Sequence, residues 1–154
     1  MRFATAAAFT LALIAPVTAA EKLTGPQIER AFRDNTVSGR YASGGFFTEF
    51  HAPDGRATGH NGWQKNTDAC WITQDDRVCY YYGPPSNRTT HCFTVELTGD
   101  LYVLRNTANG AINAVARIEP GNPRRHGEKD EPWYCDGMIS KAPEPNMSRR
   151  LASR

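Results

Sequence analysis

Histidine is the residue type in this chain with the widest chemical range, and its four copies are His51, His60, His91 and His126. None belongs to a His-x-x-x-His or Cys-x-x-Cys pair of the kind that holds zinc. The sequence also has no Gly-x-Ser-x-Gly nucleophile elbow. His51 could form a hydrolytic dyad with Asp54, but a Pro-Asp-Gly turn selects aspartate for backbone reasons alone. We therefore expect no catalytic residue, no metal site and no cofactor, and we predict that the protein is not an enzyme.

The four cysteines are expected to form two disulfides. Four cysteines allow three pairings, and the sequence by itself leaves all three open. We predict Cys79–Cys92 and Cys70–Cys135, with Cys70–Cys79 as the chief alternative pair and four buried free thiols as a further one. Cys79 and Cys92 could also bind a metal together with His91. In an oxidising compartment the disulfide is the expected state.

The strands that position Cys79 and Cys92 follow from the turns around them. Asp75-Asp76 is a two-residue turn between runs rich in aromatic and β-branched residues, which is the pattern of a hairpin that pairs Trp71 with Tyr80. If the next loop closes about Pro85-Ser86, Cys79 lies opposite Cys92 at roughly 4.5–5.5 Å, near disulfide reach. The same register brings Val78 opposite Phe93. Because a one-residue slip would reverse every side chain, these two agreements favour this register.

One face of this meander collects aromatic side chains, several of which have polar tips. A third strand after Gly99-Asp100 extends the face, and side chains alternate along each strand. The residues that share the face are Trp71, Tyr80, Tyr82, Phe93, Tyr102 and Leu104. Such a face is most often an ordinary core. As a functional alternative, the five aromatic residues Trp71, Tyr80, Tyr82, Phe93 and Tyr102 could line a barrel mouth that holds a small apolar or aromatic ligand.

The loop from Gly83 to Thr90 offers a different kind of site. Its Gly-Pro-Pro-Ser-Asn-Arg sequence is stiff and polar, and a plain hairpin connection would need nothing more. As a presented loop it could instead enter a partner's cleft, as the loops of secreted inhibitors do. The residues that would make this contact are Pro84, Pro85, Asn87 and Arg88.

The remaining sequence indicates an antiparallel β domain with one short N-terminal helix. Thr24-Gly25-Pro26 can begin the helix, and an apolar stripe of Ile28, Ala31 and Phe32 requires it to pack against the sheet. Turn signals recur roughly every 8–12 residues, as in sandwiches and barrels. Strand glycines at 59 and 62 indicate bulges or bends. We predict a mainly β fold, an antiparallel meander curled into a small barrel or half-barrel with the helix at one end. Ile112, Ala114, Ala116 and Ile118 are expected to share one face of the last strand.

The chain ends are expected to lie outside this domain. Arg2, the apolar run 3–15 and the small residues before Ala20 form a secretory signal pattern, with cleavage after Ala19 or Ala20. A retained N-terminal anchor is the alternative, although a membrane span needs about 20 apolar residues. We therefore predict a signal peptide at 1–20, a β-rich globular domain at 21–122, and an extended, partly disordered tail at 123–154. No transmembrane segment is expected after signal removal.

Charge and motif pattern restrict the class of partner. The formal net charge is +2, and loss of Arg2 with the signal leaves +2 − 1 = +1, which argues against nucleic acid. The sequence contains a series of short motifs: Asn35-Thr36-Val37-Ser38-Gly39, Phe47 to Phe50, Asp54-Gly55, Gly59, Gly62-Trp63, Cys79-Tyr80 and Cys92. This pattern resembles a group of small exported proteobacterial proteins. That group is generally labelled only as a domain of unknown function. The resemblance spans residues 23 to 97, implies a periplasmic or secreted location in a Gram-negative bacterium, and transfers no catalytic residues.

These observations lead to two main functional hypotheses, with an envelope enzyme of unknown reaction as a third. The first is an exported periplasmic β domain that binds an unknown small molecule or an envelope component without catalysis. The second is a secreted inhibitor or protein-interaction module that acts through the loop from Gly83 to Thr90.

Overall fold

The computed structural model describes residues 19–62, 64–83, 87–129 and 135. The expected signal peptide falls almost entirely outside these ranges, as do two of the four residues expected to contact a partner from the loop, Pro84 and Pro85. Within the described ranges no helix is long and apolar enough to cross a membrane.

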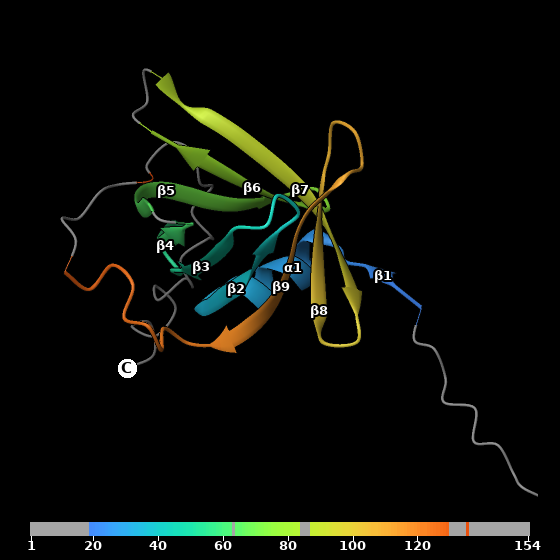
Figure 1. Cartoon of the computed structure of the whole chain (residues 1–154), viewed down its shortest axis with the longest axis horizontal. Coiled ribbons are helices and arrows are strands. Elements are labelled where there is room, and N and C mark those ends of the chain that lie inside the picture. The colour runs from blue at the N-terminus through green and yellow to red at the C-terminus, as the bar shows by residue number, and fades with distance from the viewer. Residues whose placement is uncertain (1–18, 63, 84–86, 130–134, 136–154) are drawn as a thin grey trace, which may run out of the picture.

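The described chain forms a closed antiparallel barrel of eight strands (Figure 1). Each of these eight strands pairs with its neighbours in sequence, and the last of the eight also pairs with the first of the eight, so the sheet closes rather than remaining a half-barrel. The strands are β2 (Asn35–Tyr41), β3 (Phe46–His51), β4 (Arg56–Asn61), β5 (Gln64–Gln74), β6 (Arg77–Tyr82), β7 (Thr89–Thr98), β8 (Leu101–Asn106) and β9 (Ile112–Pro120). A short β1 (Glu21–Lys22) pairs with the second half of β7 outside this ring.

The predicted register of the central meander is confirmed. Trp71 pairs with Tyr80, and Cys79 pairs directly with Cys92. Both predicted disulfides are present: Cys79–Cys92 links β6 to β7 with a Cα–Cα distance of 4.1 Å, and Cys70–Cys135 ties β5 to the residues after β9 with a Cα–Cα distance of 5.7 Å. The second disulfide therefore holds a distant part of the chain against the barrel wall.

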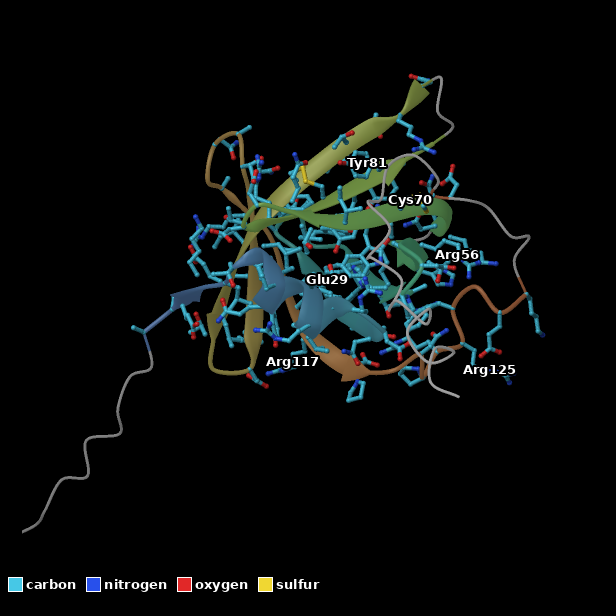
Figure 2. The ribbon with its side chains drawn as sticks, turned by 180° about the vertical axis from the view of Figure 1, so that it is seen from behind. Glu29, Arg56, Cys70, Tyr81, Arg117 and Arg125 are labelled. Atoms are coloured by element: carbon cyan, nitrogen blue, oxygen red, sulfur yellow. A yellow bond between two sulfur atoms is a disulfide. The ribbon has the colours of Figure 1, made fainter. Side chains whose placement is uncertain are left out.

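The helix α1 (Gly25–Phe32) packs over the end of the barrel where β2 begins, in contact with β2, β5 and β6. Ile28 and Phe32 from its apolar stripe are fully buried. The backbone N–H of Thr24 donates to Gln27 Oε1 at 2.8 Å, which is half of a capping box. Glu29, labelled on the helix in Figure 2, accepts a hydrogen bond from the Thr73 hydroxyl of β5 at 3.0 Å. The helix therefore closes this end of the barrel, as the sequence predicts.

One face assignment in β9 is wrong. Strict alternation would place Ile112 inside with Ala114, but Ile112 is 44% exposed. The pairing of β9 with β8 shifts here, from Leu104 opposite Ala114 to Arg105 opposite Ile112, which leaves Asn113 as an extra residue. A bulge of this kind turns the chain locally, and as a result Asn113 faces the barrel interior in place of Ile112.

Gly59 lies where two strands approach each other closely, beside a bulge of the kind that a glycine in a strand predicts. A Cβ atom at this position would collide with the carbonyl oxygen of Thr48 on β3. Next to it, between Ala57 and Gly59, the pairing of β4 with β5 shifts register. The barrel therefore bends where only a glycine fits.

The residues directly after β9 form turns against the barrel. The His126 imidazole lies 3.2 Å from the Thr48 hydroxyl, and its backbone N–H donates to the Asn122 side chain at 2.9 Å. Arg124 and Arg125 form exposed ion pairs with Glu119 and Glu128. From residue 130 onward only Cys135 lies within the described ranges.

Candidate ligand-binding cavity

A cavity of about 320 Å³ occupies the barrel interior at the end opposite α1. The strands alternate in direction, so the cavity is lined by the last residues of even-numbered strands and the first residues of odd-numbered strands. Its aromatic lining consists of Tyr41, Phe47, Tyr80, Tyr82 and Phe93; its polar lining of Glu49, Asn61, Thr89, His91 and Asn113; and its aliphatic lining of Leu104 and Ala114.

The aromatic rings form two groups that come from different walls. Tyr41 on β2 and Phe47 on β3 lie with ring centroids 4.7 Å apart. Tyr80 and Tyr82 on β6 stack at 6.3 Å, and Phe93 on β7 lies 6.1 Å from Tyr80. In a ring of eight consecutive strands β2 and β6 are four positions apart, so the two groups face each other across the cavity.

Glu49 on β3 is a carboxyl group buried at the cavity wall. It is 9% exposed, and its Oε1 accepts a hydrogen bond from the Asn66 side chain of β5 at 2.5 Å. Burial raises the pKa of Glu49 to about 7, although the hydrogen bond from Asn66 acts in the opposite direction. Desolvation disfavours the charged form of an acid, so this carboxyl exists in both protonation states near neutral pH.

His51, two residues further along β3, is fully buried between the cavity and α1. Its Nδ1 lies 3.1 Å from the Glu49 carbonyl oxygen, and its Nε2 lies 2.7 Å from the Tyr80 hydroxyl. A carbonyl can only accept, so Nδ1 carries the proton and Nε2 accepts from Tyr80. Burial lowers the pKa of His51 to about 3. The imidazole is therefore neutral and orients Tyr80.

The tyrosine hydroxyls around the cavity remain protonated. Burial first, and the nearby negative charge of Glu49 second, raise the pKa values of Tyr41, Tyr80 and Tyr82 above their usual range. Each hydroxyl can therefore both donate and accept a hydrogen bond. The Tyr80 hydroxyl already donates to His51.

Three of the five aromatic residues singled out from the sequence line this cavity: Tyr80, Tyr82 and Phe93. Trp71 lies deeper, 3% exposed, with its ring against His51 and its indole N–H donating to the Ala52 carbonyl at 3.1 Å. Tyr102 lies at the helix end of the barrel, with its ring 6.1 Å from that of Phe32. One end of this sheet face therefore lines the cavity, and the other end packs in the part of the barrel that α1 covers.

The loop from Gly83 to Thr90 begins at the mouth of the cavity. Tyr82 and Thr89, which pair across its base, both line the cavity. Asn87 is exposed, and the Arg88 guanidinium donates to the Gly83 carbonyl at 3.2 Å. Arg88 is therefore engaged with its own loop.

Sequence reasoning did not identify Glu49 as part of a site, and it considered His51 only with Asp54. In the structure Asp54 pairs with Arg56 at 2.7 Å, whereas His51 contacts Tyr80 and the Glu49 backbone. The signal that could have found Glu49 is its place in alternation with Phe47 and His51. Phe46 and Phe50 on the opposite face of the same strand obscured that signal.

Within the described ranges no three His, Cys, Asp or Glu side chains gather in a way that could hold a metal ion. Comparison with models of known families, with curated proteins and with solved structures finds no match to this chain.

Proposed function

We propose that this protein is an exported, non-enzymatic domain that binds a small molecule in the cavity opposite α1. The observation that carries the proposal is the preformed cavity itself, lined by five aromatic rings around one buried carboxyl group. Ligand sites are concave and mostly apolar, with a few convergent polar groups and titratable residues with perturbed pKa values. Barrels of about eight strands have an interior that side chains fill or that holds one small ligand.

The export part of the proposal is supported by the two disulfides and by the signal-like pattern of the first twenty residues. Disulfides form and persist mainly in oxidising compartments such as the periplasm. The non-enzymatic part is supported by how the buried polar groups are used. Both His51 nitrogens have hydrogen-bond partners, and Glu49 is held by an amide rather than by a second acid or base.

An amide NMR screen of the mature, disulfide-intact protein with a library of small fragments tests the proposal. Fragments that bind should perturb cavity residues such as Tyr82, Thr89 and Phe93. Ala114→Phe fills the cavity from β9 and should abolish these perturbations. Ile112→Phe adds the same ring two residues away on the exposed side and should leave them intact. Perturbations that persist in the filled variant, or that never involve the cavity, would refute the proposal.

A further inference from the structure

We propose that the ligand of this cavity is a small organic cation, whose ammonium group binds the Glu49 carboxylate and the faces of the surrounding aromatic rings. The inference rests on the proposed function and names its ligand class. Three features support it: the unmatched charge of Glu49, the arrangement of the rings, and the size of the cavity.

The first feature is that an ionised Glu49 has no cationic partner among the described residues that line the cavity. Its Oε1 accepts from a neutral amide, Asn66, and its Oε2 lies 3.9 Å from Nε2 of His51. That nitrogen is occupied by the Tyr80 hydroxyl, and the imidazole is neutral. Buried charges in proteins are normally paired. The missing positive charge is one that a ligand can supply.

The positively charged side chains nearest in sequence to the cavity are directed elsewhere. Neither lysine nor arginine occurs among the described lining residues. Arg40 lies on the outer surface, with its guanidinium 3.8 Å from the centre of the Phe46 ring. Arg88 donates to the Gly83 carbonyl, and Arg105, next to Leu104, pairs with Glu96 at 2.9 Å. His91 lines the mouth, with its ring 5.9 Å from that of Tyr82. An anionic ligand would therefore enter a site with a buried carboxyl group and no arginine or lysine among these residues.

The second feature is that aromatic rings stand on opposite walls. Tyr41 and Phe47 on β2 and β3 face Tyr80 and Tyr82 on β6 across the barrel. The face of an aromatic ring carries negative charge density, and rings that surround a cation bind quaternary ammonium groups well. Tyrosine hydroxyls on the same walls can accept hydrogen bonds from a primary or secondary ammonium.

The third feature is size. The cavity of about 320 Å³ is at the lower end of the range of about 300–1,000 Å³ for ligand pockets. That space fits a compact ammonium compound.

Three probes of nearly the same shape separate this ligand class from its rivals: choline, the neutral 3,3-dimethylbutan-1-ol, and the anionic 3,3-dimethylbutanoate. Amide NMR titrations of the mature, disulfide-intact protein, above the Glu49 pKa of about 7, should show choline perturbing the cavity residues. We expect choline to bind at least about tenfold more tightly than the alcohol, with the anion weakest, because only the cation is attracted both by the carboxylate charge and by the ring faces.

Two variants and one control identify the groups responsible. Glu49→Gln keeps the shape and the acceptor for Asn66 but removes the negative charge, and it should lower the choline-to-alcohol affinity ratio at least about tenfold. Tyr82→Leu removes one ring face and should lower that ratio at least about twofold. Asp100→Asn removes one negative charge from the exposed turn between β7 and β8, at the helix end of the barrel, and should leave the ratio unchanged.

The outcomes separate this inference from the proposed function. If the alcohol or the anion binds the cavity as tightly as choline, the cation inference fails and the cavity remains a binding site. If none of the three probes binds while other fragments do, the inference fails in the same way. If neither probes nor fragments perturb the cavity, both fail. An equal loss of choline and alcohol binding in Glu49→Gln would assign Glu49 a structural role and also overturn the inference.

Discussion

The buried carboxyl of Glu49 predicts how stability depends on pH, and this prediction needs no ligand. Burial raises the pKa of Glu49 from 4.5 to about 7, so the folded protein keeps a proton there that the unfolded chain has already released. The free energy of unfolding therefore contains a contribution that is fully present below pH 4.5 and is lost as the pH rises through about 7. A pKa change of one is worth about 1.4 kcal/mol, so the loss is about 3 kcal/mol. Glu49→Gln should remove this pH-dependent loss of stability, because an amide does not ionise.

His51 has the opposite dependence. Burial lowers its pKa from 6.5 to about 3, so its contribution to stability is present above pH 6.5 and is lost as the pH falls toward 3. Between about pH 4.5 and 6.5 the folded protein holds one proton on Glu49, and the unfolded chain holds one on His51. The two states bind the same number of protons, so this pair makes stability flat there. In Glu49→Gln the cancellation is lost, and stability should fall by about 1.4 kcal/mol for each pH unit below 6.5.

Urea unfolding of the mature, disulfide-intact protein, followed by tryptophan fluorescence between about pH 4 and pH 8, measures these free energies. The difference between Glu49→Gln and the unmodified protein should grow by about 3 kcal/mol from pH 4.5 to above pH 7, in favour of the variant. Asp100→Asn is the matched control. Asp100 is exposed, and its partner Arg117 lowers its pKa, so the side chain titrates below this pH range. The free energy of unfolding of this variant should therefore change with pH in the same way as that of the unmodified protein. A Glu49→Gln difference that does not change with pH would refute the burial argument.

Two further predictions concern the packing that shapes the cavity. Tyr80→Phe removes the hydroxyl that donates to buried Nε2 of His51 and should lower the free energy of unfolding by about 1–3 kcal/mol. Tyr82→Phe should cost less, and equal costs in urea unfolding would contradict the assigned hydrogen bond. Gly59→Ala forces a methyl group against the neighbouring strand and should cost about 1–3 kcal/mol. Gly45→Ala, where the nearest atom is 3.7 Å away, should stay within about 0.5 kcal/mol in thermal unfolding, and similar costs at both glycines would contradict the close approach.

Predictions from sequence succeeded where the deciding interactions are local. The register that opposes Cys79 and Cys92 depends on a two-residue turn, a short loop and strict alternation, all within the stretch from Asp75 to Cys92. The helix from Gly25 to Phe32 depends on one cap and one apolar stripe. In β9 the same alternation failed at Ile112, because a bulge at Asn113 depends on how β9 meets β8. Alternation predicts which face of the sheet a residue occupies only where the two paired strands stay in register.

The prediction of cavity residues succeeded and failed for the same reason. Tyr80, Tyr82 and Phe93 were identified because they share a face with clear alternation, but that face does not indicate how far along the barrel each residue lies. Trp71 and Tyr102 share the face and lie outside the cavity lining, toward the end that α1 covers. The sequence carries no signal for height in a barrel, because height depends on strand tilt and closure.

The sequence by itself determined the meander, its turns, the register that opposes Cys79 and Cys92, and the helix, since each follows from contacts between nearby parts of the chain or from turn chemistry. The pairing of Cys70 with Cys135, 65 residues apart, was open in the sequence and is decided by the tertiary structure. Only the tertiary structure decided that β9 pairs with β2 and closes the barrel, bringing together residues about eighty positions apart, such as Asn35 and Pro120. Closure is also what removes Glu49 and His51 from water and shifts their pKa values in opposite directions. Burial depends on all the strands that surround a side chain, so alternation along β3 could at most assign Glu49 and His51 to one face and could not give the depth of their burial or the shift of their pKa values.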